Sequence, residues 1–139
     1  MRHRRVIAAV AGLTWSVGAV ACSCIKWDPD FIAERAEIIF LGEVTSVDTA
    51  HPENMPRDTW GDNVAFPFNF HAIEKLKGES DNLRLFLIGP PSSCELKLAA
   101  GERRIFILSR GKAFVGWCNV VKPTETNLTD LKAAVKGKR

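Results

Sequence analysis

The sequence predicts a small, mainly β domain whose strands close into a barrel and whose cysteines form two disulfides. Two observations carry this prediction. Several short apolar segments are separated by turn residues, and four cysteines lie beyond the first 21 residues. The clearest segment is Phe66-x-Phe68-x-Phe70, where an aromatic side chain at every second position predicts a strand with one buried face. A chain of 139 residues is expected to form one domain.

The first 21 residues have the three regions of a secretory signal peptide. Three arginines precede an apolar run, which ends in Ala19-Val20-Ala21 directly before Cys22. The run is shorter than the roughly 20 apolar residues that a membrane-spanning helix needs. We therefore expect residues 1–21 to be removed on export. Residues 22–139 then form the domain, either secreted or held in the periplasm or cell envelope.

The positive charge of the chain belongs to this leader. The whole chain has 19 Lys and Arg against 16 Asp and Glu, and the leader contributes three arginines and no acidic residue. The remainder is therefore balanced, with 16 residues of each sign. A neutral domain gives no electrostatic reason to expect binding to nucleic acid.

Two short helices are expected to flank the strands. Asp28 is a typical helix N-cap and Pro29 suits a first turn, so a helix is predicted from there to about Ala36. A second helix is predicted over 128–136, capped by Asn127. Its apolar face would consist of Leu128, Leu131, Ala134 and Val135.

Five segments have the composition of β strands. The first is apolar on both faces in its first half, and Gly42 within it indicates the bulge or bend that small barrels need. Residues 48–62 are rich in turn formers and predict a loop. Five strands with such a bend predict a closed or nearly closed Greek-key barrel of the oligonucleotide/oligosaccharide-binding (OB) type. The expected strands are 38–47, 64–77, 83–88, 104–109 and 113–117.

No arrangement typical of catalysis is visible. His51 lies in the polar loop, and His71 is out of phase with the phenylalanines, so its side chain is expected to face outward. Neither histidine belongs to a Ser/His/Asp or Cys/His pattern. The cysteines also lack the paired Cys-x2–4-Cys spacing of structural zinc sites. The sequence therefore predicts a protein that is not an enzyme and has no metal or cofactor of its own.

Three tryptophans remain after the leader is removed. Large aromatic side chains are buried in most proteins, so packing in the core is the expected role for each of them. They are Trp27, Trp60 and Trp117.

The most informative feature is Cys22-Ser23-Cys24 at the expected new N-terminus. A bond within this pair would close a strained ring, so each cysteine is expected to bond a distant one. Two pairings satisfy this condition, namely 22–94 with 24–118, or 22–118 with 24–94. Either pairing holds the N-terminus rigidly, and each bond contributes on the order of 4 kcal/mol in the chain-entropy model. A rigid α-amine, with a pKa of about 7.7–8, and the Cys22 carbonyl oxygen together form a chelating pair for a metal ion.

This pattern resembles the netrin-like domain family, and within it the N-terminal domain of the tissue inhibitors of metalloproteinases. The Cys-x-Cys start followed by two single cysteines is its most specific part, and the resemblance covers most of residues 22–139. The matching segments are Cys22-Ser23-Cys24, 31–44, 70–78, Ser92-Ser93-Cys94, Gly101 with 105–108, and Trp117-Cys118.

The resemblance implies a five-stranded barrel with the pairing 22–94 and 24–118. It implies that Cys22 chelates the catalytic zinc of a protease through its α-amine and carbonyl. The side chain of Ser23 would then point into the pocket beside that zinc. The loop that carries Ser92 and Ser93 would flank the same site. The expected partner is a zinc metalloprotease or another extracytoplasmic protein.

Two alternatives remain open at this point. The domain is either a non-inhibitory netrin-like interaction module of the cell envelope, or a lipoprotein anchored at Cys22. The segment Ala19-Val20-Ala21-Cys22 partly fits a lipobox. Lipidation uses the Cys22 sulfur and blocks its amine, so it excludes both the disulfide and the chelation. It is also the one case in which attachment to a membrane is expected.

Overall fold

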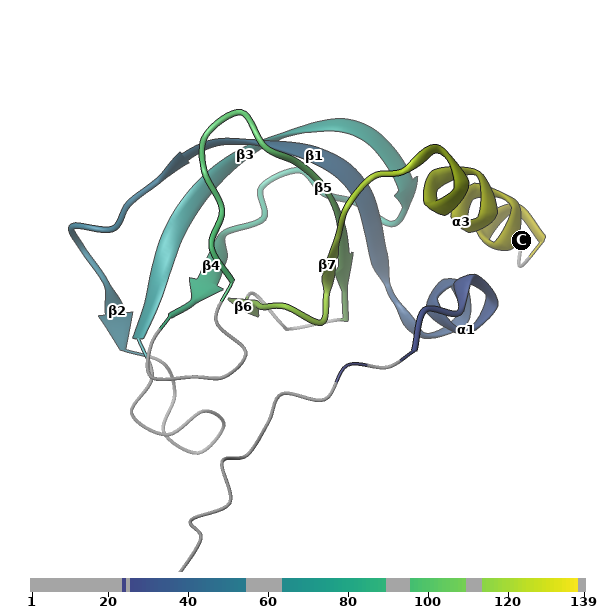
Figure 1. Cartoon of the computed structure of the whole chain (residues 1–139), viewed down its shortest axis with the longest axis horizontal. Helices are drawn as coiled ribbons and strands as arrows, with labels where there is room; N and C mark the ends of the chain where they lie inside the picture. Colours follow the sequence, from purple (N-terminus) through teal and green to yellow (C-terminus); the bar gives the residue numbers. More distant parts are fainter. Residues whose placement is uncertain (1–23, 25, 55–63, 90–95, 110–113, 138–139) are drawn as a thin grey trace, which may run out of the picture.

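The computed structural model describes residues 24, 26–54, 64–89, 96–109 and 114–137. These residues form a mainly β domain with a short early helix, a C-terminal helix and one disulfide (Figure 1). In chain order the elements are α1 (Pro29–Arg35), β1 (Ile38–Val47), β2 (Glu53–Asn54), β3 (Val64–Lys77), β4 (Leu85–Ile88), β5 (Arg103–Leu108), β6 (Phe114–Val115), β7 (Val120–Val121) and α3 (Glu125–Gly137).

The strands form one sheet that curls into a nearly closed barrel (Figure 1). Their order is β6-β4-β3-β1-β5-β7, and β2 pairs with β3 beside this path. The pairing of β4 with β6 is parallel and the others are antiparallel. Because β6 and β7 follow each other in the chain, the turn of residues 116–119 joins the two ends of the sheet.

The strand count corrects the sequence prediction. Five strands were expected, and the described residues contain seven. The two additional strands, β2 and β7, have two residues each, which is too short to produce a hydrophobic period. Both exist because their backbones pair with longer strands, β2 with β3 and β7 with β5. One of them, β2, lies within the segment that was expected to be a loop.

The central strand of the sheet is β1, which pairs with β3 on one edge and with β5 on the other. Its pairing with β5 keeps one register throughout, whereas its pairing with β3 is shifted at three places, one of them between Leu41 and Gly42. The bulge predicted at Gly42 is therefore confirmed. A Cβ atom at Gly42 would lie 2.9 Å from the Phe40 ring, so the absence of a side chain lets β1 bend around its own aromatic residue.

An aromatic cluster fills the barrel. Phe40 and Phe106 are fully buried, and their ring centroids lie 5.0 Å apart with a 16° angle between the planes. Phe70 lies 5.0 Å from Phe40, and Phe68 lies 5.9 Å from Phe106. Such pairs contribute about 0.5–1.5 kcal/mol each beyond the area they bury. The one-sided burial predicted for the phenylalanines of β3 is confirmed, since Phe68 and Phe70 both belong to this cluster.

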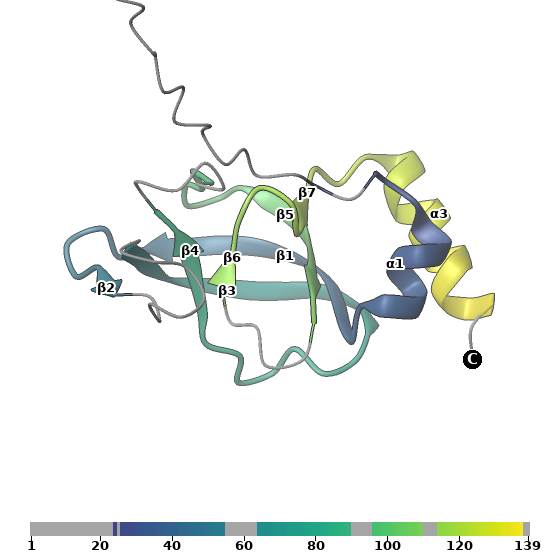
Figure 2. The ribbon, with the colours of Figure 1, turned by 90° about the horizontal axis from the view of Figure 1, so that it is seen from below.

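The two helices lie side by side outside one end of the barrel (Figures 1 and 2). A second hydrophobic cluster joins them to the sheet, with Ile39, Leu76 and Ile105 from the strands and Ala33 and Leu131 from the helices. This cluster explains why the first half of β1 is apolar on both faces. Its side chains alternate between the barrel interior and the helices.

The sequence predicted the N-cap residue of the first helix correctly and that of the last helix incorrectly. Asp28 caps α1, since its Oδ1 accepts the backbone N–H of Phe31 at 3.1 Å, as predicted. The predicted cap of the last helix, Asn127, is wrong. The Oγ1 of Thr124 accepts the N–H of Asn127 at 3.1 Å, and the helix begins at Glu125. Thr124 offers the same cap geometry three residues earlier, so Asn127 falls inside the first turn.

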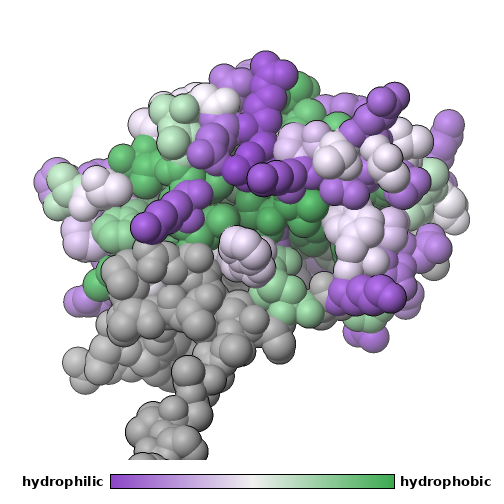
Figure 3. Space-filling view, in the orientation of Figure 1, coloured by the Kyte–Doolittle hydropathy of each residue, from purple (hydrophilic) through white to green (hydrophobic). Residues whose placement is uncertain are grey.

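The surface of the domain is mixed in character. On the face shown in Figure 3, hydrophobic residues are visible at the centre, where the strands of Figure 1 curve around them, and hydrophilic side chains surround them. Within the described part of the chain, no helix has the length and apolar character needed to cross a membrane.

Two glycines with positive φ allow a matched stability test. Gly78 follows β3 with φ +68°, and a Cβ there would lie 2.3 Å from the carbonyl oxygen of Glu37. Gly101 has φ +88° but faces open space. We predict that Gly101→Ala lowers the free energy of unfolding by about 1–2 kcal/mol through backbone strain alone. Gly78→Ala should lower it by about 1–3 kcal/mol more, because the backbone at Glu37, just before β1, must also move away.

Urea unfolding of the two variants beside the unchanged protein measures both values. Equal losses at the two positions would contradict the close contact between Gly78 and Glu37.

Candidate functional site

The residues expected to act on a partner lie outside the described part of the chain. They are Cys22, Ser23, Ser92 and Ser93, together with Cys94. The other two cysteines of the predicted site, Cys24 and Cys118, are described, and they show how this end of the domain is built.

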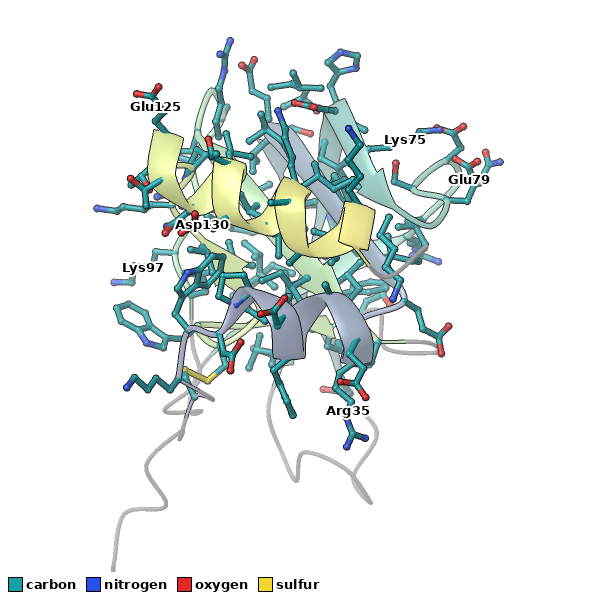
Figure 4. All side chains as sticks on the ribbon, turned by 90° about the vertical axis from the view of Figure 1, so that its right-hand side faces the viewer. Arg35, Lys75, Glu79, Lys97, Glu125 and Asp130 are labelled. Atoms are coloured by element: carbon teal, nitrogen blue, oxygen red, sulfur yellow. A yellow bond between two sulfur atoms is a disulfide. The ribbon has the colours of Figure 1, made fainter. Side chains whose placement is uncertain are left out.

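Cys24 and Cys118 form a disulfide across 94 residues of chain, with their Cα atoms 4.8 Å apart. The bond is the one that the resemblance implies for these two cysteines, and it excludes the pairing of Cys24 with Cys94. Both cysteines are exposed. Figure 4 shows the bond in yellow near the start of α1. The bond ties the segment before α1 to the turn that closes the barrel.

Asn119 fixes the closing turn. Its side-chain Oδ1 accepts the N–H of Gly116 at 2.7 Å, and its Nδ2 donates to the carbonyl of Phe114 at 3.3 Å. Its backbone carbonyl accepts the N–H of Ile107 on β5 at 2.9 Å. The turn is therefore bonded to β5 and to β6, and Cys118 sits within a rigid frame. Sequence reasoning missed Asn119, because a single Asn after a Cys carries no recognisable signal.

Trp117 lies next to the disulfide and is 65% exposed. The expectation that it packs in the core is therefore wrong. The expectation fits Trp27 better, since that side chain is half-buried and packs against the cluster of the helices. Trp60 lies outside the described residues. An exposed tryptophan on a rigid turn offers a large apolar contact surface at little cost in side-chain entropy.

The two histidines are not brought together. The Nδ1 of His51 lies 3.1 Å from the Asp48 carboxylate, and this hydrogen bond lowers the pKa of Asp48. Asp48 also accepts the N–H groups of Ala50 and His51, so the group forms a local turn. His71 is exposed on β3, as predicted.

The described residues contain no group of three or more His, Cys, Asp or Glu side chains placed to hold a metal ion. At this end of the domain the described residues therefore offer an exposed disulfide and, next to it in the chain, the exposed side chain of Trp117.

No family model matches the chain, and no curated protein matches it.

We predict a large loss of stability when the disulfide is removed. The double variant Cys24→Ser/Cys118→Ser should lower the free energy of unfolding by about 4 kcal/mol, because the bond closes a loop of 94 residues. Urea unfolding of the double variant beside the unchanged protein, both measured without reductant, tests this. A loss below about 1 kcal/mol would show that the bond does not constrain the unfolded chain in this way.

Proposed function

We propose that residues 22–139 form an exported netrin-like domain that inhibits a zinc metalloprotease through the α-amine and carbonyl oxygen of Cys22. The observation that carries the proposal is the Cys24–Cys118 disulfide, which fixes the chain two residues after the expected chelating group. In this proposal the domain binds a partner and performs no catalysis of its own.

The strand order supports an OB-type barrel. β6 and β7 behave as one strand that the 116–119 turn interrupts, with β6 beside β4 and β7 beside β5. Counted this way, the order becomes β1, β3, β4, β6/β7, β5 and then β1 again, which is a closed ring of five strands. The short β2 is then an addition to the edge of β3. Five strands closed in this way fit the OB type.

The proposed mechanism depends on a held N-terminus. Two residues of extended chain span at most about 7 Å, so the Cys24 anchor confines the amine of Cys22 to the neighbourhood of Trp117. Nitrogen and oxygen are both zinc ligands, and a protease zinc keeps one coordination position open for substrate or water. The amine and carbonyl of Cys22 would take that position, and Ser23 would lie beside it.

The protonation state of the amine sets the pH range. Only the uncharged amine has a lone pair for zinc, and its ordinary pKa is about 7.7–8. Inhibition of this kind therefore weakens as the pH falls below that range.

The first test extends the N-terminus by one residue. We predict that the refolded 22–139 form inhibits a zinc metalloprotease and that the same form with one added N-terminal Ala loses at least about 100-fold in inhibition constant. The added residue moves the α-amine away from the chelating geometry. The fold should not change, so the two forms should have the same unfolding midpoint.

The results separate the open alternatives. Equal inhibition by the two forms would contradict the chelation mechanism. Tight binding to a non-protease partner that tolerates the added Ala would favour the non-inhibitory interaction module. An intact mass of the mature protein that includes lipid on Cys22 would favour the lipoprotein, since the modified amine is blocked.

The second test concerns Trp117. We predict that Trp117→Ala weakens partner binding by about 10-fold or more, because exposed tryptophans on rigid supports are frequent binding hot spots. Ile73→Ala is the matched control, since Ile73 is 42% exposed on β3. Titration of both variants against the same protease measures the difference. Equal affinities would place the contact surface elsewhere.

A further inference from the structure

One edge of β3 has a long stretch without a strand partner. β3 runs from Val64 to Lys77, and β1 pairs with it over most of this length. On its other edge, β4 pairs only with Ala65–Phe68. Among the described residues, no backbone hydrogen bond joins 69–76 to the returning segment 78–84. Alternate N–H and C=O groups of 69–76 therefore point away from β1, with no backbone partner from the part of the chain that the structure describes.

A groove lies along this unpaired edge. It has a volume of about 330 Å³, at the lower end of the range for ligand sites. One wall is β3, from Phe68 to Ala72 and again at Lys75, and the other wall is the returning segment from Ser80 to Leu83. The β3–β4 hairpin therefore lacks inter-strand backbone hydrogen bonds in the part nearest its turn, where a regular hairpin would have them.

Lys75 connects the two walls at one end of the groove. Its Nζ donates to Asp81 Oδ2 at 2.7 Å and also to Glu79 Oε1. The hydrogen bond from Lys75 lowers the pKa of Asp81, and the bonds to Asp81 and then Glu79 raise the pKa of Lys75. Figure 4 shows Lys75 and Glu79 close together, far across the view from the disulfide. The groove is therefore separate from the surface around Trp117.

Ser80 adds an unused polar group to the groove wall. The residue is 2% exposed, and its Oγ has no hydrogen-bond partner among the described residues. An unsatisfied buried hydroxyl costs about 1–3 kcal/mol, and nearly all such groups in native proteins have a partner. Its position beside an unpaired strand edge suggests that a ligand supplies the partner.

We propose that this groove binds a short extended peptide segment of another protein, which pairs with the free edge of β3. Another extended backbone is the ligand that satisfies alternating N–H and C=O groups together, as in other cases of strand addition. The returning segment 79–83 lies on the far side of the groove from the β3 edge. The occupant must therefore be a single extended segment that carries no further strand on its outer edge. A second folded copy does not meet this condition, because its own β3 carries the same segment.

The charges at the end of the groove that Lys75 bridges indicate which charged side chains the peptide carries. Two carboxylates, Glu79 and Asp81, face the single ammonium group of Lys75, which leaves one negative charge in excess. Both carboxylates are largely exposed and accessible to a ligand. A peptide with Lys or Arg near this end is therefore favoured over an acidic one.

Selection from a library of random extended peptides tests the proposal with the oxidised protein. We expect enriched peptides to contain Lys or Arg more often than Asp or Glu. A synthetic peptide of the enriched sequence should shift the amide NMR signals of residues 69–75 and 80–83. The absence of enriched peptides, or shifts confined to other residues, would overturn the proposal. A dimer closed through these same residues would assign the groove to a second copy.

Matched variants locate the contact. His71→Trp places bulk at a groove-lining position and should weaken peptide binding by at least about 10-fold. Ile73→Trp makes the same change two residues along β3, outside the groove lining, and should leave the affinity unchanged. Equal effects of the two substitutions would contradict binding at the groove.

Ser80→Ala separates a ligand contact from a structural role. The hydroxyl has no partner among the described residues, so its removal should leave the unfolding midpoint unchanged or higher. Peptide affinity should nevertheless fall by several-fold, because the peptide loses a hydrogen bond. A lower unfolding midpoint with unchanged affinity would show that the hydroxyl serves the fold alone.

Discussion

The structure depends on β1, which is paired on both edges and buried on both faces. Its interior side chains, Phe40 and Val44, are fully buried in the aromatic cluster, while Ile39 on the opposite face joins the helices to the sheet. A single strand thus connects the barrel core to the helical layer. The bend at Gly42 permits this, because a side chain there would collide with the rings of Phe40 and Phe106. The helices can pack outside the barrel only where β1 presents an apolar outer face.

Both candidate surfaces lie where the ladder of the sheet is interrupted. At one of them, the 116–119 turn separates β6 from β7, and the chain there is held by Asn119 and by the disulfide. At the other, β3 continues beyond the residues that pair with β4, and Lys75 bonds to Asp81 and Glu79 across the gap. Interruptions of this kind expose groups that a regular sheet would pair, so they are the natural places for contact with other molecules.

The sequence predicted the parts of the fold that rest on local pattern. The bounds of β1 and β3 agree with the predicted segments because their apolar residues are long, regular runs. Asp28 is recognisable as a cap because it precedes Pro29, whereas the last helix is capped by Thr124 and not by the predicted Asn127. β2 and β7 were missed, since partners far away in the chain define them. The exposure of Trp117 was also missed, because burial is a property of the assembled fold.

The same distinction applies to the functional surfaces. A Cys-x-Cys pattern is visible in a sequence, and it led to the end of the domain that carries the disulfide. The open edge of β3 has no sequence signature, because the strand itself reads as regular alternation, and the gap depends on where β4 stops pairing. The Ser80 hydroxyl, which has no hydrogen-bond partner within the described part of the chain, likewise becomes visible only in the folded structure. An unpaired strand edge promotes association with other chains, so it lowers the stability or solubility of a domain that exposes it. The edge of β3 beside the ion-paired turn carries this cost, and a bound strand would remove it.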